Sequence, residues 1–179
     1  MKKYVINNVI AEQNWCVPAT LEMVLKHFGF MDITQYDIAK QLIIVSDQEC
    51  IDHKKWGAQI KTNTLNNFFS KNHIPLIEEY IPISHFIDDF FMIDKLEELL
   101  AKGITVVCGF NYTYLYSSRE DTFQHVSIIT EVVKGGREVT LLDPGPKDAG
   151  YKTVRAEDLF LAIQAAGDGL WCIKPKAEY

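Results

Sequence analysis

The sequence lacks several features that would assign it to a membrane, nucleic-acid-binding or multidomain class. No window approaches the roughly 18 consecutive apolar residues that a spanning helix requires. Eighteen basic residues against 24 acidic ones give a net charge of −6, and the basic ones cluster only at Lys2-Lys3 and Lys54-Lys55, so nucleic-acid binding has no support. There is also no Pro- or Ser-rich linker, internal repeat or low-complexity run. We therefore expect one domain over residues 1–179, with a core drawn from the 47% of residues that are hydrophobic.

Targeting and metal-binding signals are missing as well. The N-terminal stretch MKKYVINNVIAEQNW contains no apolar segment of signal-peptide length and no small-residue cleavage site, which predicts a cytoplasmic protein. The cysteines, Cys16, Cys50, Cys108 and Cys172, lack the paired spacing of a zinc site, and the C-x-x-H that Cys50 forms with His53 supplies half a site at most. Cys108 and Cys172 fall in apolar, strand-like runs, where we expect reduced core residues. No metal and no cofactor are expected.

Cys16 differs from the other cysteines because it stands at the start of an apolar helix. Pro18 suits the first helical turn, and Gly29 marks the end of the helical pattern. The apolar positions recur at helical spacing: Val17, Leu21, Val24, Leu25 and Phe28. Unpaired N–H groups and the positive end of the helix dipole would face the sulfur and favour its reactive thiolate form. A lone cysteine in this position is more often a packed core residue, so the catalytic interpretation depends on residues further along the chain.

Two later residues supply the parts that a thiolate nucleophile needs. His125 opens the strand-like run HVSIITEVV, and Asp143 closes the run EVTLLD, with Lys134-Gly135-Gly136 between them. Two β-rich runs separated by a Gly-containing turn predict an antiparallel hairpin that returns Asp143 to the level of His125. The alternative is a structural histidine followed by an ordinary Asp-Pro turn.

Side-chain parity in this hairpin decides whether the pair can meet. A loop of the two glycines alone would place Asp143 opposite Ile128, on the face away from His125. A three-residue loop over residues 134–136 places Asp143 opposite Ser127 and on the same face as His125, within diagonal reach. The catalytic hypothesis therefore requires an odd loop or a bulge.

This order of motifs resembles the bacteriocin-leader-processing peptidases and their stand-alone relatives, within the papain-like cysteine peptidases. The likeness continues through the segments ITQYDIAKQL, WGAQIKTNTLNNFFSKNHIPL, KLEELLAKGITVVCGF, VRAEDLFLAI and LWCIKP. It implies an α+β, papain-like fold, with an N-terminal helical half whose nucleophile helix packs against a C-terminal antiparallel sheet. It also implies that Cys16 is the nucleophile, His125 the general base and acid, and Asp143 the residue that orients the imidazole. The implied reaction is hydrolysis of a peptide or other amide bond through an acyl-enzyme on Cys16.

The resemblance is incomplete at the expected oxyanion donor. Members of the group commonly carry Gln six positions before the nucleophile and often Gly directly after it, whereas this sequence has Ile10 and Val17. Gln13 is the nearest substitute, with Asn14 or Trp15 as further candidates, unless Gln13 is a solvated loop residue. Two other functions therefore stay open, acyl transfer from the same thioester and an inactive binding module. The substrate is expected among peptides and small amides, and the sequence does not indicate the oligomeric state.

The expected layout is helical to about Leu100 and mainly β thereafter. Strands are predicted near residues 105–110, 125–133, 138–142 and 170–174. The stretch 111–122, rich in tyrosine and polar residues, is expected to form an exposed loop beside His125. Phe86, Phe90 and Phe91 are expected in the core rather than in the wall of a groove.

Overall fold

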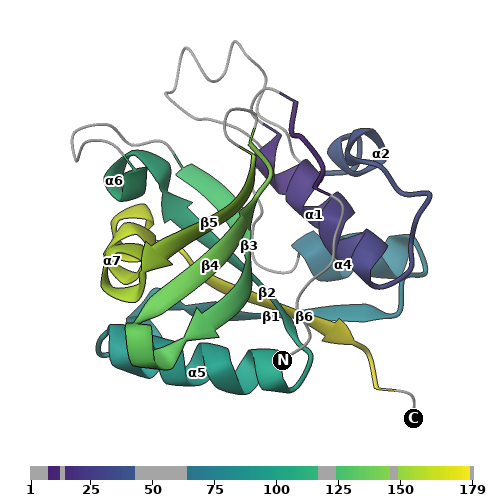
Figure 1. The fold of residues 1–179 in the computed structure, drawn as a ribbon. Coiled ribbons are helices and arrows are strands. Elements are labelled where there is room, and N and C mark those ends of the chain that lie inside the picture. The colour runs from purple at the N-terminus through teal and green to yellow at the C-terminus, as the bar shows by residue number, and fades with distance from the viewer. Residues whose placement is uncertain (1–7, 13–14, 43–63, 117–123, 146–148, 178–179) are drawn as a thin grey trace.

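Six antiparallel strands form one sheet with helices packed on both of its faces (Figure 1). The computed structural model describes residues 8–12, 15–42, 64–116, 124–145 and 149–177. The strand order is β1-β6-β2-β3-β4-β5, and each neighbouring pair is antiparallel. In chain order the elements are α1 (Cys16–His27), α2 (Gln35–Ala39), α4 (Thr64–Lys71), β1 (Leu76–Pro82), a 3₁₀ turn (Ile83–His85), α5 (Asp89–Ala101), β2 (Thr105–Asn111), α6 (Tyr112–Tyr116), β3 (Gln124–Val133), a second 3₁₀ turn (Lys134–Gly136), β4 (Glu138–Asp143), β5 (Gly150–Arg155), α7 (Ala156–Ala166) and β6 (Gly169–Pro175). The predicted α+β fold class is confirmed.

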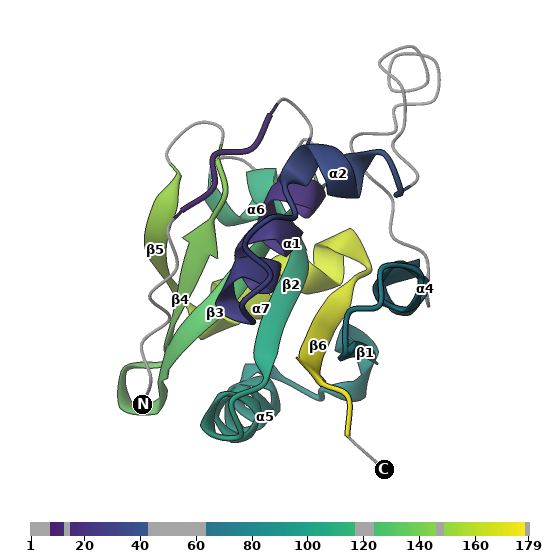
Figure 2. The ribbon, with the colours of Figure 1, turned by 90° about the vertical axis from the view of Figure 1, so that its right-hand side faces the viewer.

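The sheet separates two hydrophobic cores. On one face, residues such as Val107 and Ile128 pack with α1 and α4, and on the other, residues such as Val106 and Ile129 pack with α5 and α7. This alternation follows from the two-residue period of a strand, which sends neighbouring side chains to opposite faces. Figure 2, which looks at the sheet from the side of α1, shows α1 in front of the strands and α7 behind them. The central strands are therefore apolar on both faces, which explains why they read as continuous hydrophobic runs.

Helix α1 has the bounds that its sequence pattern predicted. It begins at Cys16 and ends at His27, and its residues from Val17 to Leu25 are all buried. Gly29 adopts a positive φ of 95°, which an L side chain rarely accepts, and this conformation ends the helix. Because α1 is surrounded by core and fixed along its length, the position of its first residue is also fixed.

The hairpin between β3 and β4 reaches the required register through a bulge, the second of the two expected routes, and not through a three-residue loop. Val133 pairs with Glu138, so the loop has four residues rather than three. A β-bulge between Ile129 and Glu131 then shifts the register by one residue, and Ile128 pairs with Leu142. The bulge restores the parity that the longer loop removes. Asp143, the next residue, consequently lies at the position opposite Ser127.

The predicted layout missed two strands and a short helix. β1 lies within the half expected to be helical, and β5 lies after Asp143. Both are edge strands with polar residues on exposed positions, LIEEYIP and GYKTVR, so neither has the continuous apolar run that identified the central strands. The stretch expected to be a loop from residue 111 begins instead with the end of β2 and with α6, while residues 117–122 lie outside the described part.

The core assignment of the α5 aromatics was wrong for two of the three residues. Phe90 and Phe91 are 55% and 57% exposed, whereas Phe86 is partly buried against the α5–α7 core. Asp88 caps the helix by accepting a hydrogen bond from the N–H of Phe91, and in the first turn Asp89 and Met92 are buried while Phe90 and Phe91 lie on the solvent side. The Arg137 guanidinium lies over the Phe90 ring, 4.1 Å from its centroid, and covers part of that surface.

Candidate active site

Cys16 is the first residue of α1 and lies at the end of the helix that faces β3 and β4. Its side chain is half-buried and packs against the core on the α1 face of the sheet. One turn further along, the Thr20 hydroxyl donates a hydrogen bond to the carbonyl oxygen of Val126, at 3.5 Å. This contact joins the beginning of the second turn of α1 to the strand residue that follows His125. The helix start is therefore held against the beginning of β3.

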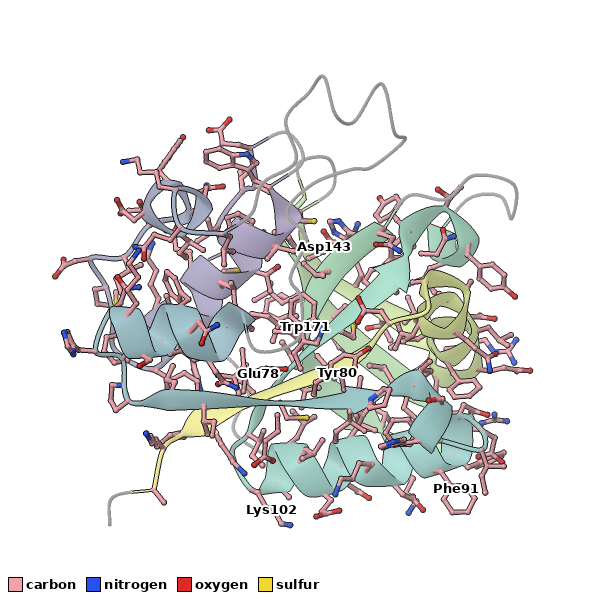
Figure 3. All side chains as sticks on the ribbon, turned by 180° about the vertical axis from the view of Figure 1, so that it is seen from behind. Glu78, Tyr80, Phe91, Lys102, Asp143 and Trp171 are labelled. Carbon is pink, nitrogen blue, oxygen red and sulfur yellow. The ribbon has the colours of Figure 1, made fainter. Side chains whose placement is uncertain are left out.

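His125 and Asp143 are in direct contact beneath this helix start. The Nε2 atom of His125 lies 3.0 Å from Oδ1 of Asp143, and the side chains are 3% and 0% exposed. The backbone N–H of Gly145 donates to the same Oδ1 atom, at 2.8 Å. In Figure 3, Asp143 is seen at the end of the sheet near the start of α1. Because Asp143 engages Nε2, the nitrogen that can serve Cys16 is Nδ1.

The electrostatics of this pair favour a charged imidazole. Burial by itself lowers the pKa of His125, but hydrogen bonds with Asp143 and Cys16, together with their negative charges, raise that pKa to about 9. Burial raises the pKa of Asp143, but the hydrogen bond and charge of His125, the Gly145 N–H and Lys152 outweigh it and keep the pKa below its ordinary value. At neutral pH the site therefore holds a carboxylate and an imidazolium beside a cysteine sulfur, which is the arrangement of an activated thiol nucleophile.

Aromatic residues enclose the imidazole on the side of α6. The Phe110 and Tyr112 rings meet the His125 ring edge-on, with centroid distances of 5.6 and 5.2 Å. Tyr112 also contacts Tyr116, at 4.7 Å between centroids. Lys152 of β5 places its Nζ atom 3.3 Å from Oδ2 of Asp143. Sequence reasoning missed Lys152, because β5 was not recognised as an element and the alternating polar pattern YKTVR was its only signal. It placed the tyrosine-rich stretch beside His125 but expected a loop where the structure has α6.

Comparisons with known proteins bear on the family and the fold of the chain. The model of the Peptidase_C39-like family matches residues 2–165. The chain belongs to the Peptidase_C39-like family. A crystal structure of a proposed C39-like peptidase from Bacillus anthracis superimposes with a TM-score of 0.65 at 12% sequence identity, covering 98% of this chain and 97% of that chain. No curated protein matches the sequence.

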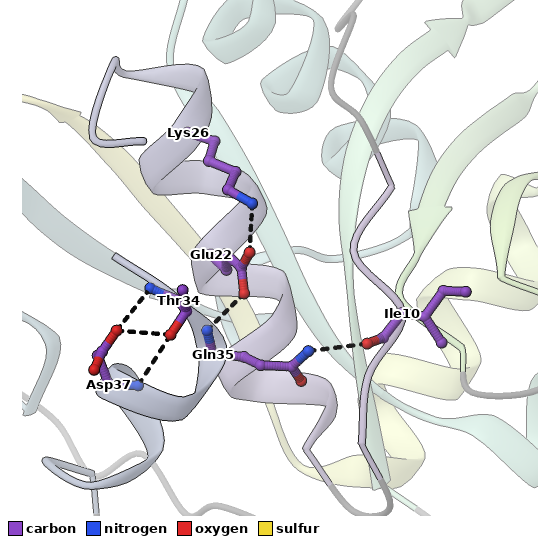
Figure 4. Close-up of polar contacts among 6 residues, drawn as sticks. All are labelled: Ile10, Glu22, Lys26, Thr34, Gln35 and Asp37. Carbon is purple, nitrogen blue, oxygen red and sulfur yellow. Dashed lines mark hydrogen bonds and ion pairs between the residues drawn. The ribbon is translucent and has the colours of Figure 1, made fainter. Parts of the chain in front are cut away.

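This C39-like chain holds the segment before Cys16 in place through Gln35 (Figure 4). The Gln35 side chain donates from Nε2 to the carbonyl oxygen of Ile10, at 3.0 Å, and accepts at Oε1 from the N–H of Glu12, at 3.2 Å. The backbone N–H of Gln35 in turn donates to the buried carboxylate of Glu22 on α1, which also pairs with Lys26. The Ile10 side chain, at the position where a Gln was expected, is 64% exposed. The fold thus fixes the backbone of residues 10–12, while Gln13 lies outside the described residues.

The remaining candidate sites gain no support. Cys50 and His53 lie outside the described residues, and among the side chains that are described no group of three or more potential ligands could hold a metal ion. Cys108 and Cys172 are buried free cysteines, as predicted, and burial raises the pKa of both thiols. Within the described ranges, no helix is long and apolar enough to cross a membrane.

Proposed function

We propose that this C39-like protein hydrolyses a peptide or other amide bond through an acyl-enzyme on Cys16. The observation that carries the proposal is the buried contact between His125 Nε2 and Asp143 Oδ1, in a site where the pKa of His125 is raised to about 9. An imidazole in this state is a proton donor at neutral pH, and a thiolate mechanism requires such a donor when the amine leaves.

The proposed reaction has two halves, acylation of Cys16 and hydrolysis of the resulting thioester, and Cys16 and His125 act in both. The Cys16 thiolate attacks the substrate carbonyl carbon, and the bond electrons move to the oxygen to form a tetrahedral oxyanion. Collapse of this intermediate breaks the C–N bond, and His125 donates its proton to the departing amine, which leaves a thioester. His125, now neutral, removes a proton from water as the water attacks the thioester, and Cys16 departs as the thiolate. Asp143 holds the ring orientation and stabilises the imidazolium throughout.

The oxyanion needs hydrogen-bond donors near the helix start. We assign this role to the backbone N–H of Cys16 and to the side chain of Gln13, on the support that residues 10–12 are anchored by Gln35. If Gln13 is the donor, the Gln13→Ala variant should lose turnover by about 100-fold or more while its thiol is still alkylated normally. The matched variants at Asn14 and Trp15 identify the donor if Gln13→Ala is unchanged.

The charge state of the site can be tested without knowing the substrate. Anionic iodoacetate and neutral iodoacetamide alkylate a thiolate by the same displacement, but a neighbouring imidazolium attracts only the anion. We expect the ratio of the iodoacetate rate to the iodoacetamide rate at Cys16 to fall as the pH rises through about 9, because His125 loses its charge there. The His125→Gln variant should show no such transition. A wild-type ratio that is constant, or that falls near the ordinary histidine pKa of about 6.5, contradicts the proposed ion pair.

Turnover separates the three remaining functions. Incubation with a mixture of peptides, followed by mass spectrometry, should reveal new termini that are absent with Cys16→Ala and present with the control variant Cys172→Ala. New termini modified by an added amine in place of water would indicate acyl transfer. Normal alkylation of Cys16 with no new products would indicate a binding module. The proposed compartment is the cytoplasm, supported by the free thiols of Cys16, Cys108 and Cys172.

A further inference from the structure

The two oxygens of Asp143 have different partners. Oδ1 accepts from His125 Nε2, at 3.0 Å, and from the N–H of Gly145, at 2.8 Å. Oδ2 lies 3.3 Å from Nζ of Lys152, whose side chain is 18% exposed. A fully buried carboxylate is costly unless both oxygens are satisfied, so Lys152 is the group that makes this burial tolerable on the side away from the histidine.

The ammonium of Lys152 is itself held from a second direction. Its Nζ atom lies over the rings of Tyr112 and Tyr116, 5.4 and 4.8 Å from their centroids. Such cation–π contacts confine a flexible side chain that would otherwise explore several rotamers. In the sheet, Lys152 pairs with Leu141 and Asp143 with Gly150, so Lys152 and Asp143 lie diagonally on one face of the β4–β5 ladder.

We propose that Lys152 is a positioning residue of the catalytic machinery, acting through Asp143 to fix the carboxylate with Oδ1 toward His125. This inference rests on the proposed function, because it assigns Lys152 a role in the same triad. Lys152 does not touch the reacting atoms. It holds the Asp143 carboxylate ionised and prevents its rotation, and it shares the negative charge of that carboxylate with the imidazolium.

Because Lys152 and His125 share the charge of one carboxylate, the charge of Lys152 should affect the pKa of His125 in a predictable direction. Lys152 and protonated His125 are like charges on either side of one carboxylate, so removing the lysine charge should make the imidazolium harder to deprotonate. Among the described residues, other titratable groups that interact with His125 or Asp143 include Cys16 from α1, Cys108 from β2, and Tyr112 and Tyr116 from α6. Burial raises the pKa of Cys108 and of Tyr116, so neither of these groups obscures a transition near pH 9.

The test measures the iodoacetate-to-iodoacetamide rate ratio against pH for Lys152→Met, Lys152→Arg and a matched control, Lys174→Met. Lys174 forms an interstrand ion pair with Glu79, at 2.7 Å, on the opposite edge of the sheet, so its variant loses a comparable contact outside the site. For Lys152→Met we expect the midpoint of the ratio to move up by about half a pH unit or more. For Lys152→Arg and Lys174→Met we expect the wild-type midpoint. Peptide turnover should fall about tenfold in Lys152→Met and recover largely in Lys152→Arg, as for other residues that orient a functional side chain.

The outcomes separate this inference from the function on which it rests. A wild-type protein without a transition near pH 9 would refute the ion pair itself. Unchanged turnover in Lys152→Met would refute the role of Lys152 and leave the ion pair standing. A lowered midpoint together with lost turnover would show that the carboxylate turns away from His125 once the lysine is removed, which supports the positioning role. The same shift in Lys174→Met would show a general effect of charge and also overturn the inference. If Lys152→Met does not fold, Lys152→Gln removes the charge with a polar side chain and is judged by the same midpoint.

Discussion

Gly109 on β2 should not tolerate even the smallest side chain, because Asp168 occupies the space above it. A Cβ atom built on Gly109 would lie 1.9 Å from Oδ2, 2.5 Å from Cγ and 3.2 Å from Cβ of Asp168. The carboxylate cannot move away freely, since its Oδ1 atom accepts hydrogen bonds from the Gly169 N–H, at 2.8 Å, and from Trp171 Nε1 and the Tyr80 hydroxyl, both at 3.3 Å. Tyr80 and Trp171 pair across β1 and β6 and lie on the same part of the sheet in Figure 3.

The cost of Gly109→Ala follows from these contacts. Displacing the carboxylate breaks hydrogen bonds to a charged acceptor and leaves a partly buried indole N–H without a partner, which together cost about 3 kcal/mol of unfolding free energy. Asp168→Ala loses the same hydrogen bonds but relieves the burial that raises the pKa of this carboxyl, so we expect about 2 kcal/mol. With Asp168 already truncated, adding Ala at position 109 should cost no more than about 1 kcal/mol, because only the 3.2 Å contact to Cβ remains.

Urea unfolding of the two single variants and the double variant, followed by tryptophan fluorescence, measures this coupling. We expect the double variant to be about 2 kcal/mol more stable than the sum of the single effects predicts. Additivity within about 0.5 kcal/mol would refute the argument, since it would mean that the Asp168 carboxylate does not compete with a Cβ atom at position 109.

Two further predictions concern the buried groups around α1 and the sheet. Glu22→Ala should lower the unfolding free energy by about 2 to 3 kcal/mol, because it leaves the buried N–H of Gln35 and the ammonium of Lys26 without their acceptor. Glu22→Gln should cost clearly less. Equal losses for the two variants in urea titrations would contradict this prediction. Brief iodoacetamide treatment of the native protein should modify Cys16 ahead of Cys108 and Cys172, because the two buried thiols can react only when the protein unfolds. Peptide mapping measures the labelling of each cysteine. Equal labelling of all three would argue against the burial of Cys108 and Cys172.

The hydrophobic patterns within single helices and strands made part of this fold predictable from the sequence. The helix from Cys16 could be read from its apolar periodicity, and the central strands β2, β3, β4 and β6 from their continuous apolar runs, which reflect burial between the two cores. The edge strands were missed because solvent exposure interrupts their sequences with polar residues and leaves no continuous apolar run. Lys152 was missed for a related reason, since its importance comes from a neighbour nine residues away on another strand, and no local pattern marks such a contact. Phe90 and Phe91 were misassigned because hydrophobicity alone does not show which face of a helix meets the core.

The bulge in the β3–β4 hairpin sets a counting rule for any change in this part of the chain. Thr130 is the extra residue on β3, and its hydroxyl donates to the carbonyl oxygen of Thr140 on the partner strand, at 3.1 Å. Insertion or removal of one residue between the bulge and the loop would turn Asp143 to the opposite face, whereas a change of two residues would leave its face unaltered. Related chains that retain the pair should therefore differ in hairpin length by even numbers, or carry a second bulge wherever the difference is odd.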